Sequence, residues 1–306
     1  MVYIITNNFC NFSCCLIEWL NYYNIENIRI NDYVIDFHKV NFKIETLNKK
    51  IKVDQNFYFV HKPCGGDYIQ NKDLINQIKF EYYQGFFKTL DENRTLGQLD
   101  FTSGNSKINI LEVINRFNIK FPESLITNSK NDLIRFHSLH NSIVTKPIHE
   151  IFDFRSNGKL YRPYTAIVTQ EDINYAPKFF GLSLFQKNIF KYCDIKSFYI
   201  DGDFYSQAIF SQHNENTSVD FRLYETNNMN RTSPFKLPNN LEIKMRKVLV
   251  YLKIKMAVVD FILDTKNEIY FLEINIEGVF ENISIDCNYN LDKIISNHIK
   301  KSYEKS

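Results

Sequence analysis

Apolar positions along the chain alternate or recur with helical spacing, and they predict strands and helices in which strands dominate the second half. The first 110 or so residues alternate between the two, an order typical of a small α/β layer. We expect strands at 2–6, 27–31, 41–45, 56–61, 122–128, 142–146, 151–154, 159–168, 182–189, 194–200, 203–211, 255–263 and 269–275. We expect helices at 11–23, within 72–90, at 106–117, from a capping box at 129–132, and at 240–252 and 289–300.

One hairpin carries three oxygen ligands on a single face. If Lys266 and Asn267 form a two-residue loop, Asp260 lies directly opposite Glu273, with Cβ atoms about 5 Å apart. Asn275 joins them two residues further along the strand. Two carboxylates and an amide among apolar neighbours are costly to bury unpaired. Mg²⁺ with nucleotide phosphates offsets that cost, so the spacing predicts a metal and nucleotide site. The alternative is a surface hairpin whose polar side faces water.

Composition narrows the class of protein. The chain has 306 residues and 44% hydrophobic content, enough for a substantial core in two or three subdomains. Because 37 basic residues face 35 acidic ones, the net charge is +2, and no overall field favours nucleic acid or an acidic membrane. No apolar run reaches the roughly 18 residues of a membrane span. Six cysteines without Cys-x-x-Cys spacing indicate reduced thiols, so we predict a cytoplasmic protein.

Two further segments fit a nucleotide site. Lys146 ends an apolar strand, where a lysine can contact phosphate as a point charge, although such a lysine is usually just solvated. The strand end formed by Gln186, Lys187, Asn188 and Ile189 can recognise adenine through main-chain groups, although it can equally be ordinary core.

The candidate side chains for catalysis and substrate binding follow these segments. Asp201 and Gly202 predict a two-residue hairpin turn, which places Lys196 opposite Gln207 on one face. Arg222 and Arg231 come next in expected loops, where a guanidinium group can hold phosphate or carboxylate through two hydrogen bonds.

With these residues in this order, the chain resembles the ATP-grasp superfamily. It is most similar to the peptide-modifying ligases that make graspetides, and among them to the grasp-with-spasm type. The match runs through nearly the whole chain. The matching segments are 122–129, 146–147, 185–186, 189, 191, 194–200, 205–212, 219–222, 230–231, 236–238, 260, 272–275 and 287–289.

The resemblance implies an α/β (α+β) ATP-grasp fold in three parts. These are an N-terminal pre-ATP-grasp domain at 1–110, a central subdomain at 111–190 and a C-terminal subdomain with the metal site at 191–306. It also implies ATP and Mg²⁺ as cofactors, a precursor peptide with leader and core as partner, and a homodimer. Partners of the nucleic-acid or membrane class are not expected.

The implied reaction activates an Asp or Glu side chain of the precursor as an acyl phosphate, which a Ser or Thr hydroxyl or a Lys amine then attacks. Positioning and charge neutralisation carry such chemistry. The resemblance assigns Mg²⁺ to Asp260, Glu273 and Asn275, and phosphate contact to Lys146. It assigns adenine to Gln186, Lys187, Asn188 and Ile189, catalysis to Arg222 and Lys196, and substrate binding to Arg231.

Several positions depart from the family pattern. Lys187 stands where Glu is usual, Lys196 where Arg is usual, and Ile276 and Val279 replace Pro and Gln; Val258 and Val259 replace Gly-Ser. Lysine lacks the two-pronged hydrogen bonding of arginine. Two alternatives therefore stay open. One is a divergent protein of low activity that binds peptide or nucleotide as the partner of another maturation enzyme. The other is a ligase for a small carboxylate substrate.

Overall fold

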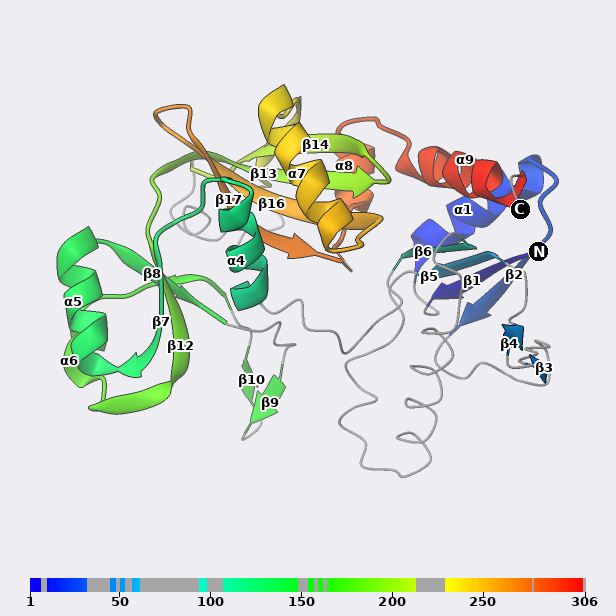
Figure 1. Cartoon of the computed structure of the whole chain (residues 1–306). Coiled ribbons are helices and arrows are strands. Elements are labelled where there is room, and N and C mark those ends of the chain that lie inside the picture. The colour runs from blue at the N-terminus through cyan, green and yellow to red at the C-terminus, as the bar shows by residue number, and fades with distance from the viewer. Residues whose placement is uncertain are drawn as a thin grey trace.

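The structure is a computed structural model in which three main sheets follow one another along the chain (Figure 1). It describes residues 1–6, 10–31, 45–47, 50–52, 57–60, 94–97, 107–147, 154–156, 159–161, 164–212, 229–276 and 278–304. The helix expected within 72–90 lies outside these residues.

The first sheet is parallel and has the order β2-β1-β5-β6. Its strands are β1 Val2–Thr6, β2 Asn27–Asn31, β5 Phe57–Val60 and β6 Thr95–Gly97, and helix α1, Asn11–Tyr22, connects the first two. All residues of β1 are buried, as expected for a strand covered on both faces. A small antiparallel pair, β3 Glu45–Leu47 and β4 Lys50–Lys52, lies between β2 and β5 in the sequence. The described part agrees with the expected α/β alternation.

The second sheet is antiparallel and has the order β11-β8-β12-β7. Its strands are β7 Ser124–Ser129, β8 Ile143–Lys146, β11 Ala166–Ile167 and β12 Phe179–Lys187. Helices α5, Lys130–His140, and α6, Gln170–Tyr175, cover one face around a small apolar core. A separate pair, β9 Phe154–Ser156 and β10 Lys159–Tyr161, lies between β8 and β11 in the sequence.

Two local expectations for this sheet were wrong. The strand expected at 159–168 is divided into β10 and β11, and helix α6 follows because Thr169 and Asp172 form a capping box. The capping box expected at Ser129 does not form, since this side chain makes no cap hydrogen bond. Thr127 takes its place, donating to Asp132 Oδ2 at 3.1 Å and accepting from the Ser129 N–H at 3.0 Å.

The third sheet is antiparallel and has the order β15-β14-β13-β16-β17. Its strands are β13 Lys191–Ile200, β14 Asp203–Phe210, β15 Arg231–Phe235, β16 Met256–Asp264 and β17 Ile269–Asn275. One face packs with α4, Lys107–Arg116, and α7, Asn239–Tyr251, in an apolar cluster that includes Ile114, Ile195, Met245 and Val259. On the other face, Phe198, Met256 and Val258 pack in a second apolar cluster that includes Phe280.

The two hairpins of this sheet differ in how well the sequence predicted them. The turn at Asp201 and Gly202 has two residues, both with positive φ, and Lys196 lies opposite Gln207 as expected. The β16–β17 connection is longer than the expected two residues, since β16 ends at Asp264 and β17 begins at Ile269. The Asp264 N–H donates to Glu268 O at 2.9 Å within this connection. A register shift between Asp260 and Phe261 compensates, so Asp260 still lies opposite Glu273.

The last two helices connect the third sheet to the first. Helix α8, Glu281–Asp286, brings Phe280 against Phe198 with ring centroids 4.5 Å apart, and α9, Leu291–Glu304, packs along α1. The Trp19 Nε1–H donates to Asp292 at 3.0 Å. The two chain ends consequently lie close together (Figure 1). Among the described helices, none is long and apolar enough to cross a membrane.

Candidate metal and nucleotide site

A row of polar side chains crosses the third sheet on the face turned away from α4 and α7, and α8 covers one end of it, where Gln207 Nε2 donates to Asp286 Oδ2 at 2.6 Å. Gln207 on β14, Lys196 on β13, Asp260 on β16 and Glu273 on β17 are paired in turn, each directly opposite the next. Opposite residues of antiparallel strands have Cβ atoms about 5 Å apart. Since the reverse face packs against α4 and α7, the strand alternation gathers these groups on one side.

Asn275 links the two carboxylates of this row. Its Nδ2 donates to Asp260 Oδ2 at 2.8 Å and to Glu273 Oε1 at 3.2 Å. Rotating the amide by about half a turn directs its oxygen to the same point, so three oxygens can surround one cation. Among the described residues no three His, Cys, Asp or Glu side chains gather. Two carboxylates and an amide nevertheless fit Mg²⁺, which completes its coordination with water and phosphate oxygens.

Lys107 also belongs to this site, although it was not among the residues expected there. It is the first residue of α4, and its Nζ lies 3.3 Å from Glu273 Oε2 and 3.0 Å from the carbonyl oxygen of Pro147. This contact ties β17 to the end of β8. A lysine at a helix start is common, and its partners are distant in sequence, so no local pattern could have identified it.

The charge balance favours an anionic ligand. Burial alone raises the pKa of Glu273, but the charges of Lys107 and Lys146, with hydrogen bonds from Asn275 and Lys107, lower this pKa from its ordinary value of 4.5. Glu273 is therefore ionised at neutral pH. Lys107, Lys146 and Lys196 supply three positive charges against the three carboxylates of Asp260, Glu273 and Asp286, so these charges balance and a bound Mg²⁺ would make the site positive.

Gly278 fixes the chain just beyond the ligands. A Cβ at this position would lie 2.5 Å from Val258 Cβ, 2.7 Å from Val258 Cγ2 and 3.0 Å from Asn275 O. Only glycine allows so close an approach. At the two departures from the family pattern nearby, Ile276 packs against the apolar cluster and Val279 is exposed.

The expected adenine segment lies where β12 leads into β13. The Lys187 N–H donates to Glu123 O at 2.9 Å, and its Nζ lies 3.6 Å from Glu123 Oε1. Asn188 is held by Ser142, through its N–H at 3.0 Å and its Nδ2 at 3.1 Å. Ile189 follows in the connection to β13. These contacts fix the segment to the second sheet.

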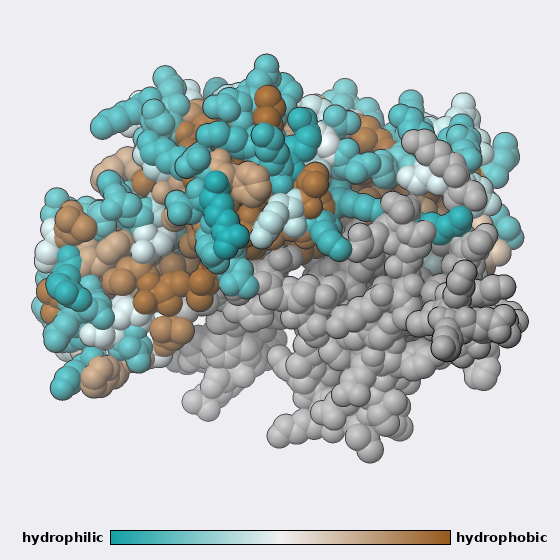
Figure 2. All heavy atoms as spheres, in the orientation of Figure 1, coloured by the Kyte–Doolittle hydropathy of each residue, from teal (hydrophilic) through white to brown (hydrophobic). Residues whose placement is uncertain are grey.

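The second sheet carries an apolar surface on its exposed side. Figure 2 shows apolar side chains gathered over the region of β7, β8 and β12. In these strands and β11, Ile167 and Leu182 are exposed, and the buried amide of Gln186 donates to Ser124 Oγ at 2.8 Å. An apolar surface with a few fixed polar groups suits a planar base.

The two arginines are placed differently from the lysines. Arg231 is the first residue of the edge strand β15 and not part of a loop as expected. It pairs with Phe210, and its Cζ lies 4.6 Å from that ring. Phe210 packs on the α7 side of the sheet, so the structure does not bring Arg231 to the polar row. Arg222 lies outside the described residues.

Comparison with known proteins gives a consistent result for the fold. No family model matches the chain, and no curated protein matches its sequence. Solved structures match over nearly the full length. An ATP-grasp ligase associated with a RiPP from Chryseobacterium gregarium, solved with ADP and a leader and core peptide, has a TM-score of 0.79 and 20% identity, over 100% of this chain and 97% of that one.

Two further structures have similar scores. The macrocyclase MdnC of Microcystis aeruginosa, bound with precursor peptide MdnA, has a TM-score of 0.76 and 17% identity, over 98% of this chain and 99% of that one. The ATP-grasp ligase PsnB, with minimal precursor, Mg and ADP, has a TM-score of 0.70 and 13% identity, over 98% of this chain and 96% of that one. The chain therefore has the ATP-grasp fold, and the expected α/β class is confirmed.

Proposed function

We propose that the protein is an ATP-dependent ligase that forms side-chain ester or amide crosslinks in a ribosomally made precursor peptide. The observation that carries this proposal is the convergence of Lys107, Lys146 and Lys196 on the oxygen ligands Asp260, Glu273 and Asn275. The similar structures solved with ADP and a precursor peptide support the same class of substrate.

The proposed ligand contacts follow from this arrangement. Asp260, Glu273 and Asn275 hold Mg²⁺, which would neutralise charge on the bound phosphates. Lys146 contacts those phosphates. Lys107 is within reach of them as well, because its Nζ lies 3.3 Å from Glu273 Oε2. Since the N–H groups of Lys187 and Asn188 are engaged by the second sheet, we assign adenine recognition to the Ile189 main chain and the apolar surface beside Gln186.

The proposed reaction has two steps. A carboxylate oxygen of a peptide Asp or Glu attacks the terminal phosphorus of ATP, and ADP leaves. A peptide hydroxyl or amine then attacks the acyl carbon, phosphate leaves, and one proton is released. Lys196 and Arg222 stabilise the charge on the transferred phosphoryl group during both steps. Each link removes the elements of one water from the peptide.

The remaining assignments concern partners and organisation. Arg231 is exposed at the edge strand β15, so we assign it to a part of the peptide away from the reacting carboxylate. The division into parts at 1–110, 111–190 and 191–306 stays a prediction, as do a homodimer and a cytoplasmic location.

One alternative keeps a specific observation behind it. Lys196 stands where the family pattern has Arg, and Ile276 and Val279 also depart from it, which favours a protein of low activity that binds peptide or nucleotide for another enzyme. The small-carboxylate ligase is the other alternative, and a turnover experiment separates all three.

Nucleotide products test the proposal. With Mg²⁺, ATP and the peptide encoded beside its gene, the protein should release ADP and phosphate only when peptide is present. Release of AMP and pyrophosphate would contradict an acyl phosphate. Nucleotide binding without turnover would favour the partner protein, and turnover with a free amino acid in place of peptide would favour the small-substrate ligase.

A further inference from the structure

Asp286 closes the end of the polar row that lies farthest from the oxygen ligands. It is the last residue of α8, and its Oδ2 accepts a hydrogen bond from Gln207 Nε2 at 2.6 Å. Gln207 is only 1% exposed, whereas Asp286 is an exposed residue. A buried amide thus holds one oxygen of a carboxylate at the protein surface.

The row sets the distance between Asp286 and the cation site. Gln207 lies on β14 and Asp260 on β16, and β13 separates these two strands. Since neighbouring strands lie about 4.8 Å apart, β14 lies about 10 Å from β16. Lys196 stands between them, opposite both Gln207 and Asp260. The proposed reaction assigns Lys196 to the terminal phosphate of ATP, so a peptide group joined to that phosphate can lie within reach of Asp286.

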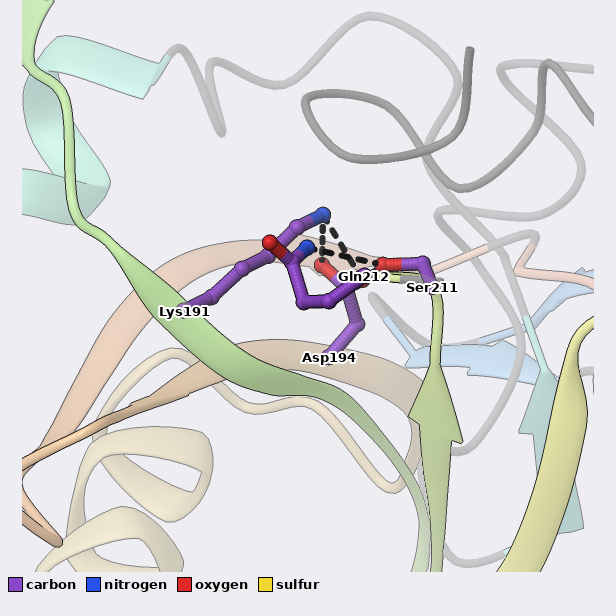
Figure 3. A network of polar contacts seen from close by, with 4 residues as sticks. All are labelled: Lys191, Asp194, Ser211 and Gln212. Atoms are coloured by element: carbon purple, nitrogen blue, oxygen red, sulfur yellow. Dashed lines mark hydrogen bonds and ion pairs between the residues drawn. The ribbon is translucent and has the colours of Figure 1, made fainter. Parts of the chain in front are cut away.

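Other carboxylates on this face of the sheet are already engaged. Two of them are assigned to Mg²⁺. A third, Asp194 on β13, is 5% exposed and accepts hydrogen bonds from Lys191 at 2.9 Å and 2.8 Å and from Ser211 at 2.7 Å (Figure 3). Asp286 differs from Asp194 in being exposed and in being held by a neutral amide.

A proton acceptor is needed in the second step of the proposed reaction. The attacking hydroxyl or amine carries a proton that must leave when the new bond to the acyl carbon forms. A carboxylate within hydrogen-bond distance of that proton can accept it, and such a transfer typically accelerates a reaction by about a hundredfold or more. The first step needs no such base, because the attacking peptide carboxylate carries no proton.

We propose that Asp286 is the general base of the second step and that Gln207 holds it in place. The Asp286 carboxylate takes the proton from the attacking hydroxyl or neutral amine as the bond to the acyl carbon forms and the bond from that carbon to phosphate breaks. Asp286 then gives this proton to solvent. Gln207 acts through Asp286 and is therefore a positioning residue. The inference rests on the proposed function, since that function supplies the acyl phosphate.

Hydroxylamine separates the two steps. It attacks an acyl phosphate without help from a protein base, and the product is a peptide hydroxamate that mass spectrometry distinguishes from a crosslink. The reactions contain Mg²⁺, ATP and the peptide encoded beside the gene. In Asp286→Asn, hydroxamate should form within about threefold of the wild-type rate, whereas crosslinking without hydroxylamine should fall by about a hundredfold or more. Asparagine still accepts a hydrogen bond from Gln207, so this variant keeps the local structure.

Two further variants complete the test. Gln207→Met removes the donor and leaves the carboxylate, so it should spare hydroxamate formation and slow crosslinking by about tenfold. Asp203→Asn is the matched control, because Asp203 is an exposed acid on β14, four residues before Gln207 and about 13 Å away along the strand. Both rates should stay at the wild-type level in this control.

Contrary results are distinct from one another. Crosslinking at the wild-type rate in Asp286→Asn would overturn the inference. An equal fall of hydroxamate formation and crosslinking in Asp286→Asn and Gln207→Met would make the contact merely structural and overturn it as well. If Asp286→Asn does not fold by circular dichroism, Gln207→Met decides, and crosslinking that is not slowed relative to hydroxamate formation overturns the inference. Failure of the wild-type protein to form hydroxamate would instead overturn the proposed function and this inference with it.

Discussion

Replacing Gly278 by alanine should damage the site through a steric conflict that the structure locates. The added Cβ would lie 2.5 Å from Val258 Cβ, which is about 1 Å closer than ordinary van der Waals contact. Val258 is fully buried in the apolar cluster that contains Phe198 and Phe280, so it has little room to move. The backbone at Gly278 must therefore shift by about 1 Å instead.

The expected cost has two parts. Overpacking of this kind destabilises by about 1–3 kcal/mol. The shift also strains the hydrogen bond from the Gly278 N–H to Asn275 O, now 3.1 Å, which contributes about 1 kcal/mol. Melting temperature should fall by about 5–10 °C for a chain of this size. Because Asn275 carries an oxygen ligand, a displacement of about 1 Å should lower turnover by about a hundredfold.

Thermal melting and peptide-dependent ADP release measure these effects. Gly181→Ala is the matched control, because nothing lies within 4 Å of a Cβ at that position, and it should melt and turn over like the wild type. In the Gly278→Ala background, Val258→Ala keeps the Cβ contact and should not restore turnover, whereas Val258→Gly removes it and should restore turnover in part. Wild-type melting and turnover in Gly278→Ala would refute this reasoning.

Three further predictions address individual side chains. Glu273→Ala or Asn275→Ala should abolish Mg-dependent nucleotide turnover while circular dichroism stays unchanged, and wild-type ATP consumption in either variant would exclude this metal site. Lys146→Ala should raise the Kd of ATP and lower turnover. Arg222→Ala should lower turnover by about a hundredfold, which is the scale of one lost transition-state contact. Kinetics with varied ATP concentration can separate the effect on binding from the effect on turnover. Because the pKa of Glu273 is lowered from 4.5 in the folded protein, its contribution to stability is present above its unfolded pKa and is lost as pH falls through the lower folded value. Lys107→Met removes one cause of this lowered pKa. When melting temperature is measured at decreasing pH, the variant should therefore lose stability at a higher pH than the wild type. An unchanged midpoint of this pH-dependent loss of stability would contradict the contact between Lys107 and Glu273.

Strand periodicity was enough to place the carboxylates together. Asp260, Glu273 and Asn275 were found because side chains on a strand alternate between two faces, and this holds whichever turn closes the hairpin. The expected two-residue loop was nevertheless wrong, since a longer connection and a register shift offset each other. Alternation thus predicts the face of a side chain better than it predicts the local path of the chain.

Long-range placement was beyond the sequence. Lys107 meets Glu273 only after the first turn of α4 packs beside β17, and nothing near Lys107 in the chain signals that contact. Arg231 was expected near the site because of its residue type. It pairs with Phe210 at the edge of the sheet and therefore lies on the face that packs against α7.

The mass of the precursor peptide after reaction tests the central claim most directly. Co-expression with the peptide encoded beside the gene, or incubation with Mg²⁺ and ATP, should give mass losses in whole multiples of one water, with a modified segment that resists fragmentation between the joined residues. Mild alkaline hydrolysis should restore the original mass if the links are esters and leave it reduced if they are amides. Unmodified peptide that binds tightly, without ATP consumption, would contradict the ligase and identify the protein as a partner of another enzyme.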